Sequence, residues 1–177
     1  GQWYFYYASD RGIRVKEMSS PTALTGEEVT LGGTQMNPGG GWTEGSFLIK
    51  KGGRYFLTYT GNHVHSKGYR INYSVGTSPK NFQKGMGNPV LLNTEDGIVG
   101  LGHSSTVLGP DLSTYYLIYH NLEGRNQWGW PIRNMNMDRI AFNGDKMTVL
   151  GPTTTEQDDP ALPKICGYFD SADTPGW

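Results

Sequence analysis

The sequence lacks several features that would place it in a common structural class. Its 177 residues include one cysteine, Cys166, so no disulfide bond can form within the chain. A chain without disulfides can be cytosolic or a well-packed secreted protein, so this absence does not decide the compartment. No run of about 18 or more apolar residues occurs, and we therefore predict no membrane-spanning helix.

An excess of charge of one sign is also missing. The 15 Lys and Arg residues balance 16 Asp and Glu residues, which gives a formal net charge of -1. A balanced chain has no basic face that would attract nucleic acid or an anionic membrane. We therefore expect neither nucleic acid nor a membrane among the partners.

Helical periodicity is nearly absent, because no long stretch repeats apolar residues at intervals of three and four. Aromatic residues and glycine are plentiful instead, with 11 Tyr, 5 Trp and 26 Gly. This composition suits many short strands joined by tight turns, or a surface that faces carbohydrate. The length is sufficient for one domain with a hydrophobic core, and we predict an all-β class.

One stretch, Trp42 to Tyr59, is predicted to be a β-hairpin. An apolar strand over residues 46–50 and an aromatic strand over 54–60 flank the turn Lys51-Gly52-Gly53, where glycine reaches the positive φ of tight turns. Glu44 stands just before the first strand. An acid beside glycine at the mouth of an apolar strand can face a cavity, but this stretch alone favours a solvated acid, because most acids are solvated.

A pattern of strands recurs three times: an apolar strand, a Gly/Asp turn, an aromatic strand, a loop and a third strand. The aromatic strands YFYYAS (4–9), YFLTYTG (55–61) and YYLIYHN (115–121) correspond, as do the turns Ser20-Pro21 and Ser78-Pro79. Their spacing of about 45 to 60 residues is typical of β-propeller blades. The first block lacks its opening strand, so we predict a partial β-propeller of about two and a half to three blades. A β-sandwich of aromatic hairpins is the alternative.

The predicted propeller part covers residues 1–150. Residues 151–177 contain Pro160 and Pro163 close together and a polar end, and we interpret them as a closing segment or linker. The chain enters a strand directly at Gly1, so we expect that it starts inside a domain.

Four segments in this order make the sequence resemble glycoside hydrolase family 43. They are Trp42-Thr43-Glu44-Gly45 with the hairpin that follows, GHSS at 102–105, TYYLIYHN at 114–121 and MDRIAFNGD at 137–145. The resemblance runs from Gly1 to about Leu150. It implies the C-terminal part of a five-bladed β-propeller enzyme, an α-L-arabinofuranosidase or β-xylosidase, that acts on arabinose- and xylose-containing polysaccharides and oligosaccharides.

The resemblance also implies an inverting mechanism with an acid, a base and a third carboxylate that tunes the acid. Glu44 matches the general acid, and we expect burial or a nearby like charge to raise its pKa. The base and the modulator would be aspartates upstream of Gly1, since Asp10 fits neither role. We therefore expect this chain alone to be inactive, with the missing N-terminal blades supplied by the same polypeptide or by a second chain.

His103 matches a family histidine near the propeller axis that often contacts calcium, so we expect a structural calcium ion there. One imidazole makes a weak site for a cation that prefers oxygen ligands, and a hydrogen-bonded histidine without metal is an equal alternative. His63 and His65 carry no metal-ligand pattern. His120 is interpreted as a packing or loop-anchoring residue.

Arg133, Trp42, Trp128 and Asn62 are the predicted substrate-binding residues. Arg133 can pair with the acid and donate to sugar hydroxyls in a fixed fork, or can be a solvated loop residue. Trp42 and Trp128 lie beside loops, where an exposed ring would stack on the apolar face of a sugar; inter-blade packing is the alternative. Asn62 could reach the pocket mouth, although asparagine after a strand is first a turn residue.

Two other functions remain open: a non-catalytic carbohydrate-binding propeller that has lost the acids, and a purely structural all-β domain. The structural reading fails if Glu44, His103 and Arg133 converge on one site. The sugar, the linkage and exo or endo action depend on rim loops that vary on one fold. We expect a secreted or periplasmic protein, with the cytoplasm also open.

Overall fold

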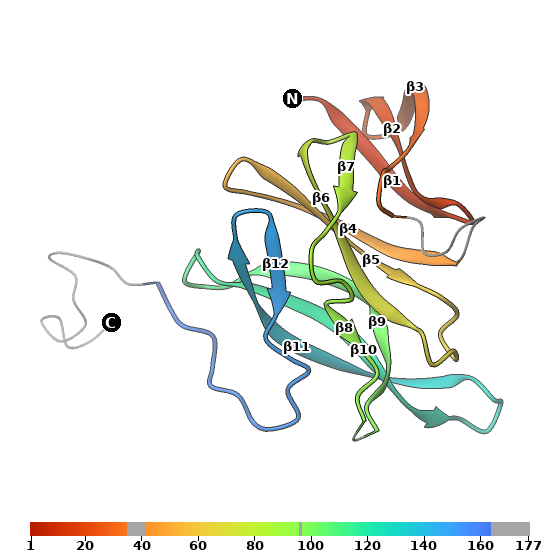
Figure 1. Cartoon of the computed structure of the whole chain (residues 1–177), viewed down its shortest axis with the longest axis vertical. Helices are drawn as coiled ribbons and strands as arrows, with labels where there is room; N and C mark the ends of the chain where they lie inside the picture. The colour runs from red at the N-terminus through yellow and green to blue at the C-terminus, as the bar shows by residue number, and fades with distance from the viewer. Residues whose placement is uncertain (35–41, 96, 164–177) are drawn as a thin grey trace, which may run out of the picture.

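The computed structural model of the chain describes residues 1–34, 42–95 and 97–163 (Figure 1). Every regular element in these residues is a β-strand, which confirms the predicted all-β class. The strands are β1 (Trp3–Ser9), β2 (Gly12–Ser20), β3 (Ala23–Thr30), β4 (Thr43–Lys51), β5 (Arg54–Gly61), β6 (Arg70–Ser78), β7 (Asn81–Lys84), β8 (Leu91–Leu92), β9 (Val99–Leu108), β10 (Tyr115–Arg125), β11 (Pro131–Asn143) and β12 (Lys146–Val149). None of the described residues belongs to a helix with the length and apolar character needed to cross a membrane.

The described strands form three antiparallel sheets. The first has the order β1-β2-β3, the second β4-β5-β6-β7 with β8 paired to β6, and the third β12-β11-β10-β9. Figure 1 shows the sheets following one another from the upper right to the bottom of the view. Each sheet packs against the next as successive propeller blades do, which confirms the predicted partial β-propeller.

The predicted repeat matches the strand order of the sheets. YFYYAS lies in β1, YFLTYTG in β5 and YYLIYHN in β10, while the turns Ser20-Pro21 and Ser78-Pro79 join β2 to β3 and β6 to β7. β1 therefore corresponds to the second strands of the other two sheets. The first sheet has no counterpart of β4 or β9 among the described residues, which agrees with the prediction that the first block lacks its opening strand.

The sequence pattern does not predict β3. This strand follows the Ser20-Pro21 turn, where the pattern ends the first block. Most of its residues are exposed, and Gly26 in its middle has a positive φ of 67°. The segment ALTGEEVT has neither an apolar run nor a regular alternation of apolar and polar residues. It forms a strand because it pairs with β2.

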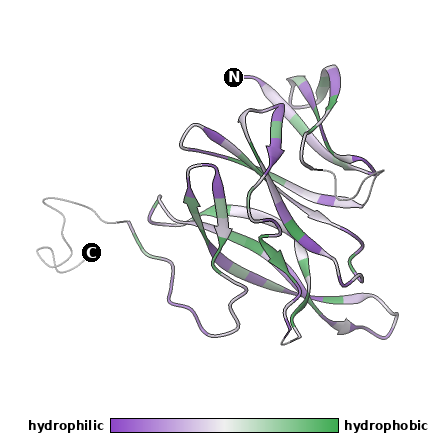
Figure 2. Cartoon of the chain, in the orientation of Figure 1, coloured by the Kyte–Doolittle hydropathy of each residue, from purple (hydrophilic) through white to green (hydrophobic). Residues whose placement is uncertain are grey.

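The hydrophobic core consists of two layers, one between each pair of neighbouring sheets. Leu57 and Tyr59 of β5 pack with Ile13 of β2 between the first and second sheets. Phe56, on the opposite face of β5, packs in the layer that contains Leu117 of the third sheet. Side chains alternate across a strand, so the second sheet is buried on both faces. Figure 2 shows hydrophobic residues interspersed with hydrophilic ones along the strands of all three sheets.

Part of the predicted closing segment packs on the third sheet. Asp138 of β11 is buried, and its carboxylate accepts hydrogen bonds from Tyr119 Oη at 2.5 Å and from the Thr153 hydroxyl. Gln157 Nε2 donates to the Met137 carbonyl oxygen at 2.8 Å. The segment after β12 is thus tied to the sheet that it follows. Its residues beyond 163, including Cys166, lie outside the described residues.

Candidate active site

Glu44 sits at the start of β4, beside a β-bulge. The register with β5 shifts between Glu44 and Phe47, so that Gly45 and Ser46 together face one residue of β5. Gly45 has a φ of 58°, a left-handed conformation that glycine adopts without strain. A bulge bends its strand and re-aims the neighbouring side chains, so this local irregularity sets the direction of the Glu44 carboxylate.

Both oxygens of the Glu44 carboxylate accept hydrogen bonds. Tyr69 Oη donates to Oε1 at 2.5 Å, and Trp42 Nε1 donates to Oε2 at 3.0 Å. His103 Nδ1, which belongs to the third sheet, lies 3.8 Å from Oε1. The Glu44 side chain is 25% exposed. It therefore reaches solvent while being held in place, unlike the freely solvated acid that the strand end alone would favour.

The pKa of Glu44 results from opposing effects. Burial raises the pKa, but the hydrogen bonds from Tyr69 and Trp42 and the nearby His103 lower it, and the net pKa lies below its ordinary value. Hydrogen bonds donated to a carboxylate favour its charged form. The expected raised pKa is therefore wrong for this chain, because the donors around Glu44 outweigh its burial.

Tyr69 is a residue of this site that the sequence patterns do not single out. It lies just before β6 and is fully buried. Its ring stacks on His120 at a centroid distance of 5.9 Å and packs over Gly102, where an added side-chain carbon would come within 2.2 Å of the ring. Burial raises the pKa of Tyr69 and Glu44 raises it further, so Tyr69 stays a protonated donor. Its partners are far away in sequence, Glu44 in β4 of the same sheet and His120 and Gly102 in the third sheet, so no local sequence signal could have identified it.

His103, His120 and Arg133 surround the Glu44–Tyr69 pair. The His103 backbone N–H donates to Thr60 Oγ1 at 2.7 Å, which joins β9 to β5. The pKa of His120 is lowered to about 4, first by burial and then by the charges of Arg133 and His103. The charge of Arg133 also acts on Tyr69. The structure thus brings Glu44 and His103 to one site, with Arg133 near enough for its charge to act on Tyr69 and His120, and the purely structural reading does not predict this arrangement.

The fit of a calcium ion to this site depends on its donors. The described residues contain no group of three or more His, Cys, Asp or Glu side chains arranged to hold a metal. Calcium takes about six to eight oxygen ligands, whereas His103 offers one nitrogen. His103 alone therefore does not make a calcium site, and a calcium ion there would need oxygen ligands from water or from residues outside the described ranges.

Trp42 and Asn62 take different positions at the rim. Trp42 is exposed, and besides its bond to Glu44 its ring meets His63 edge-on at a centroid distance of 6.1 Å. Asn62 has a φ of 69°, and its Nδ2 donates to the Gly68 carbonyl oxygen at 2.9 Å, closing its own loop. The contacts of Asn62 are those of a turn residue, which was the alternative to its predicted substrate role.

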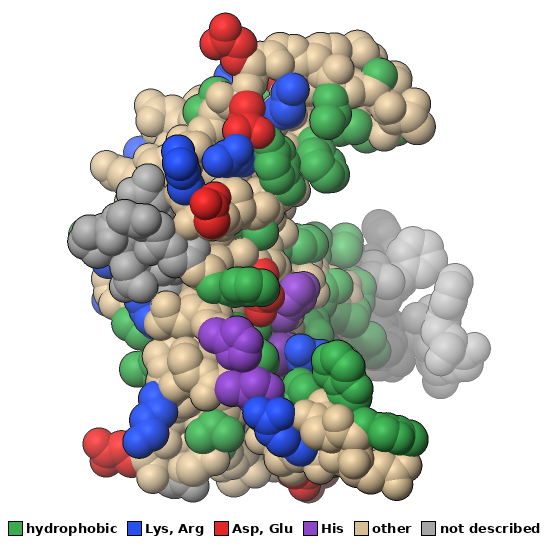
Figure 3. Space-filling model, turned by 90° about the vertical axis from the view of Figure 1, so that its right-hand side faces the viewer, with side chains coloured by type: hydrophobic (Ala, Val, Ile, Leu, Met, Phe, Trp, Pro, Cys, Tyr) green, Lys and Arg blue, Asp and Glu red, His purple; other side chains and the backbone are tan. Residues whose placement is uncertain are grey.

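A pocket of about 460 Å³ opens beside this site, between the loop that joins β5 to β6 and the hairpin that joins β10 to β11. We call it the arginine pocket. Its ionisable and aromatic lining residues are His63, His65, Arg125, Trp128, Trp130 and Arg133. Figure 3 shows this face of the molecule, with histidine side chains gathered near its middle and basic and hydrophobic side chains beside them. Of the predicted substrate-binding residues, Trp128 and Arg133 line this pocket.

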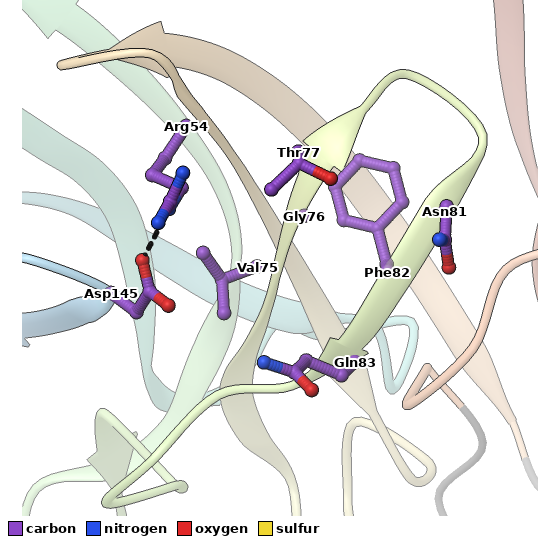
Figure 4. Close-up of a pocket in the computed structure, with 8 residues that line it drawn as sticks. All are labelled: Arg54, Val75, Gly76, Thr77, Asn81, Phe82, Gln83 and Asp145. Atoms are coloured by element: carbon purple, nitrogen blue, oxygen red, sulfur yellow. Dashed lines mark hydrogen bonds and ion pairs between the residues drawn. The ribbon is translucent and has the colours of Figure 1, made fainter.

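A second cavity, of about 250 Å³, lies at the opposite end of the strands (Figure 4). Arg54 Nε donates to Asp145 Oδ1 at 2.5 Å on one side of it, which ties the start of β5 to the turn between β11 and β12. β5 runs from Arg54 to Gly61, so a rise of about 3.3 Å per residue puts its two ends roughly 20 Å apart. None of the predicted site residues lines this cavity.

Comparisons relate the chain to known proteins over most of its length. The family model of the glycosyl hydrolases family 43 matches residues 1–148. The crystal structure of a thermostable family-43 glycoside hydrolase is similar with a TM-score of 0.75 and 31% identity, over 91% of this chain and 57% of that chain.

Two further crystal structures share the fold at lower identity. An α-L-arabinofuranosidase from Lactobacillus brevis gives a TM-score of 0.71 and 21% identity, over 89% of this chain and 55% of that chain. An endo-1,4-β-xylanase from Bacteroides thetaiotaomicron gives a TM-score of 0.68 and 24% identity, over 85% of this chain and 55% of that chain. The chain thus spans somewhat more than half the length of these three structures. No curated protein matches it.

Proposed function

Because the chain belongs to glycosyl hydrolase family 43, we propose that it forms part of a glycoside hydrolase acting on arabinose- or xylose-containing polysaccharides and oligosaccharides, with inversion at the anomeric carbon. Proteins that share its fold include an α-L-arabinofuranosidase and an endo-1,4-β-xylanase, which supports this range of substrates. Within that range, the residues around Glu44 are the part of the chain best suited to the reaction.

The placement of Glu44 is the observation that supports this function most directly. As general acid, Glu44 would protonate the glycosidic oxygen while the bond to the leaving sugar breaks. Tyr69 and Trp42 hold the two carboxylate oxygens, and the side chain is still partly exposed. A carboxyl group that is held in place beside an open pocket meets the positional requirement of acid catalysis.

A base and a third carboxylate would complete the mechanism, and we propose that both come from blades outside these 177 residues. β1 is an edge strand, whereas its counterparts β5 and β10 are covered by β4 and β9. Trp3 and Phe5 of β1 are exposed large aromatic residues. A neighbouring strand or blade would cover such an edge. A second carboxylate near Glu44 would also raise its pKa toward the value an acid needs, and the chain alone is expected to be inactive.

Substrate contacts are proposed for Arg133, Trp42 and Trp128. The two tryptophans are exposed at the rim, where their rings can stack on sugar faces. Arg133 lies in the arginine pocket and can donate to sugar hydroxyls. Asn62 would act indirectly, because its side chain closes the loop that carries His63 and His65.

The variant Glu44→Gln in the full-length protein tests the acid role. It keeps the shape of the side chain but cannot donate a proton to the leaving group. Hydrolysis of xylobiose or arabinobiose should fall by about 10²–10⁴-fold, whereas activated aryl glycosides, whose leaving groups need little protonation, should be largely spared. The measurement is kcat for both substrate types.

Equal losses on the two substrate types would contradict the acid role of Glu44. The control is Glu156→Gln, at an exposed acid in the segment after β12. This variant should leave both rates unchanged.

A non-catalytic carbohydrate-binding propeller is the second candidate. The lowered pKa of Glu44 favours it, because a carboxylate already ionised at neutral pH accepts hydrogen bonds from sugar hydroxyls but has no proton to donate. Binding of xylotriose or arabinotriose by the full-length protein, with no release of shorter products, would support this candidate over the hydrolase.

We also propose a calcium ion at the propeller axis. It would take His103 as one ligand, with waters completing its shell, and metal analysis of the purified full-length protein would detect it.

We propose a secreted or periplasmic location, which would give the protein access to polysaccharide, and the cytoplasm remains the alternative. Fractionation of the producing cells distinguishes these compartments.

A further inference from the structure

The arginine pocket carries more positive charge than a neutral sugar requires. Among the described residues that line it are Arg125, Arg133, His63 and His65, and none is an Asp or Glu. Neither guanidinium lies within 4.0 Å of a carboxylate in the described part of the chain. The described lining therefore supplies two arginines without supplying an anion to pair with them.

The positive charge of the two arginines changes the pKa values of neighbouring histidines. Desolvation lowers the pKa of His65, and the charges of Arg125, His63 and Arg133 lower it further. Arg133 also lowers the pKa of His120, after the larger effect of burial. The charges of Arg125 and Arg133 thus reach the pocket and the groups beside it.

The aromatic side of the pocket is held in place by its own backbone. Trp128 and Trp130, at the tip of the β10–β11 hairpin, are 73% and 69% exposed. Their backbone N–H groups both donate to Asn126 Oδ1 at 3.0 Å, and Arg125 Nη1 donates to the Gly129 carbonyl oxygen at 2.7 Å. A turn fixed in this way presents its rings with little entropy left to lose on binding, and exposed indole rings suit the apolar face of a sugar.

The pocket is continuous with the surroundings of Glu44. Trp42 donates to the Glu44 carboxylate, its ring meets His63 at 6.1 Å, and the His63 ring lies 5.5 Å from that of His65. His63 and His65 line the pocket. A sugar chain that places a glycosidic oxygen at Glu44 can therefore extend over Trp42 and place a neighbouring unit in the arginine pocket.

We propose that the arginine pocket binds a sugar unit that carries a carboxylate, namely a uronic acid, next to the bond held at Glu44. The planar guanidinium matches a carboxylate with two parallel hydrogen bonds, and these charge-assisted bonds are stronger than those to neutral hydroxyls. Trp128 and Trp130 provide the stacking surface for the ring of the same unit. This proposal deepens the proposed function, and rests on it for the passage of a sugar chain past Glu44.

Isothermal titration of the full-length Glu44→Gln protein tests the proposal without turnover of the ligand. The two probes are xylotriose and xylotriose that bears one glucuronic acid substituent. We expect the acidic probe to bind about tenfold more tightly or better, and this preference to shrink when NaCl is raised from about 0.05 to 0.5 M. Equal affinity for the two probes, or no binding of either, would overturn the proposal.

Two variants and a control identify the groups responsible. Arg133→Gln and Arg125→Gln should each reduce the preference for the acidic probe by about tenfold while changing the affinity for xylotriose less. Arg139→Gln, at an exposed arginine of the same strand as Arg133 but outside the pocket, should leave the preference intact. A preference that survives both pocket substitutions would contradict the assignment. Because Arg125 also holds the hairpin tip, Arg133→Gln is the decisive variant.

The outcomes separate this proposal from the proposed function. Hydrolysis is measured on neutral disaccharides and depends on Glu44, so its failure would leave the affinity difference between the two probes untouched. Conversely, an enzyme that cleaves xylobiose but binds both probes equally would retain the proposed function and lose the uronic acid site.

Discussion

The second and third sheets share one backbone plan but carry different chemistry at the same place. In each, the first strand bulges opposite a tyrosine of the second strand, Tyr59 in one sheet and Tyr119 in the other. The bulge in β4 is Gly45-Ser46, and that in β9 is His103-Ser104. Both bulges open with a residue of positive φ, 58° at Gly45 and 51° at His103. The repeat therefore extends to the irregularities of the strands.

The side chains at these equivalent positions are complementary. Glu44 precedes the bulge of β4, whereas Gly102 precedes the bulge of β9. An added carbon at Gly45 would come 3.0 Å from His103 Cα, and one at Gly102 would meet the Tyr69 ring. Each glycine thus makes room for a functional side chain of the other sheet. The difference between the sheets shows that the repeat supplies the scaffold, while departures from it supply the site.

The largest expected effect tests whether the two core layers are equivalent. Leu57 and Leu117 occupy the same position of the repeat, two residues before the bulge tyrosine, and both are fully buried. Leu57→Ala and Leu117→Ala should each lower the free energy of unfolding by about 2–5 kcal/mol, because each leaves a cavity. Urea unfolding measures both. Leu162→Ala, at an exposed position, should change it by less than about 0.5 kcal/mol.

A large loss at Leu117 with almost none at Leu57 would break the comparison. It would mean that the first sheet does not pack on the second in solution.

The next prediction tests whether Gly102 and Gly45 leave space for side chains of the neighbouring sheet. Gly102→Ala places a carbon 2.2 Å from the fully buried Tyr69 ring and 2.7 Å from Thr60 Cγ2, so we expect a loss of about 3 kcal/mol. Gly45→Ala mainly imposes a left-handed conformation on alanine, at about 1–2 kcal/mol. Thermal and urea unfolding of both variants provide the values. If Gly102→Ala were the milder of the two, Tyr69 would not be packed against β9 as described.

A smaller effect concerns the hydrogen bond from Tyr69 to Glu44. Tyr69→Phe keeps the ring but removes a donor to a charged group, so it should cost about 1.5–3 kcal/mol near pH 7. The pKa of Glu44 is lower in the folded state than its ordinary value of 4.5. The charged carboxylate therefore stabilises the fold at pH values above 4.5, and this stabilisation is lost as the pH falls through the folded-state pKa. The cost of Tyr69→Phe should therefore shrink in acid.

Tyr73→Phe is the matched control for this pH dependence. Tyr73 is also fully buried, but its hydroxyl contacts only backbone: it donates to the Met86 carbonyl oxygen at 2.9 Å and accepts from the Met147 N–H at 3.1 Å. Its loss leaves that buried N–H unpaired and should cost about 1–3 kcal/mol at every pH. An NMR titration of the Glu44 carboxyl carbon provides a direct readout, because its pKa should rise in Tyr69→Phe and stay unchanged in Tyr73→Phe. A fall of that pKa in Tyr69→Phe would contradict the account.

Much of the scaffold follows from the sequence, and less of the site does. The hairpin around Lys51-Gly52-Gly53 and the three aromatic strands are visible because side chains alternate and glycine marks the turns. β3 is missed because exposed polar residues carry no such pattern. Glu44 and His103 are identified by resemblance, whereas Tyr69 is not, since it resembles any strand-end tyrosine.

The sequence by itself determined the all-β class, the repeat of strands and the glycine turn of the β4–β5 hairpin, because these depend on local alternation and backbone freedom. Tertiary structure decided what lies around Glu44. The tyrosine before β6 meets the carboxylate only after β4, β5 and β6 pair into one sheet, and the histidine of the next sheet meets it only after the blades pack. This assembly also set the sign of the pKa shift of Glu44, since burial alone would raise it and the assembled donors lower it.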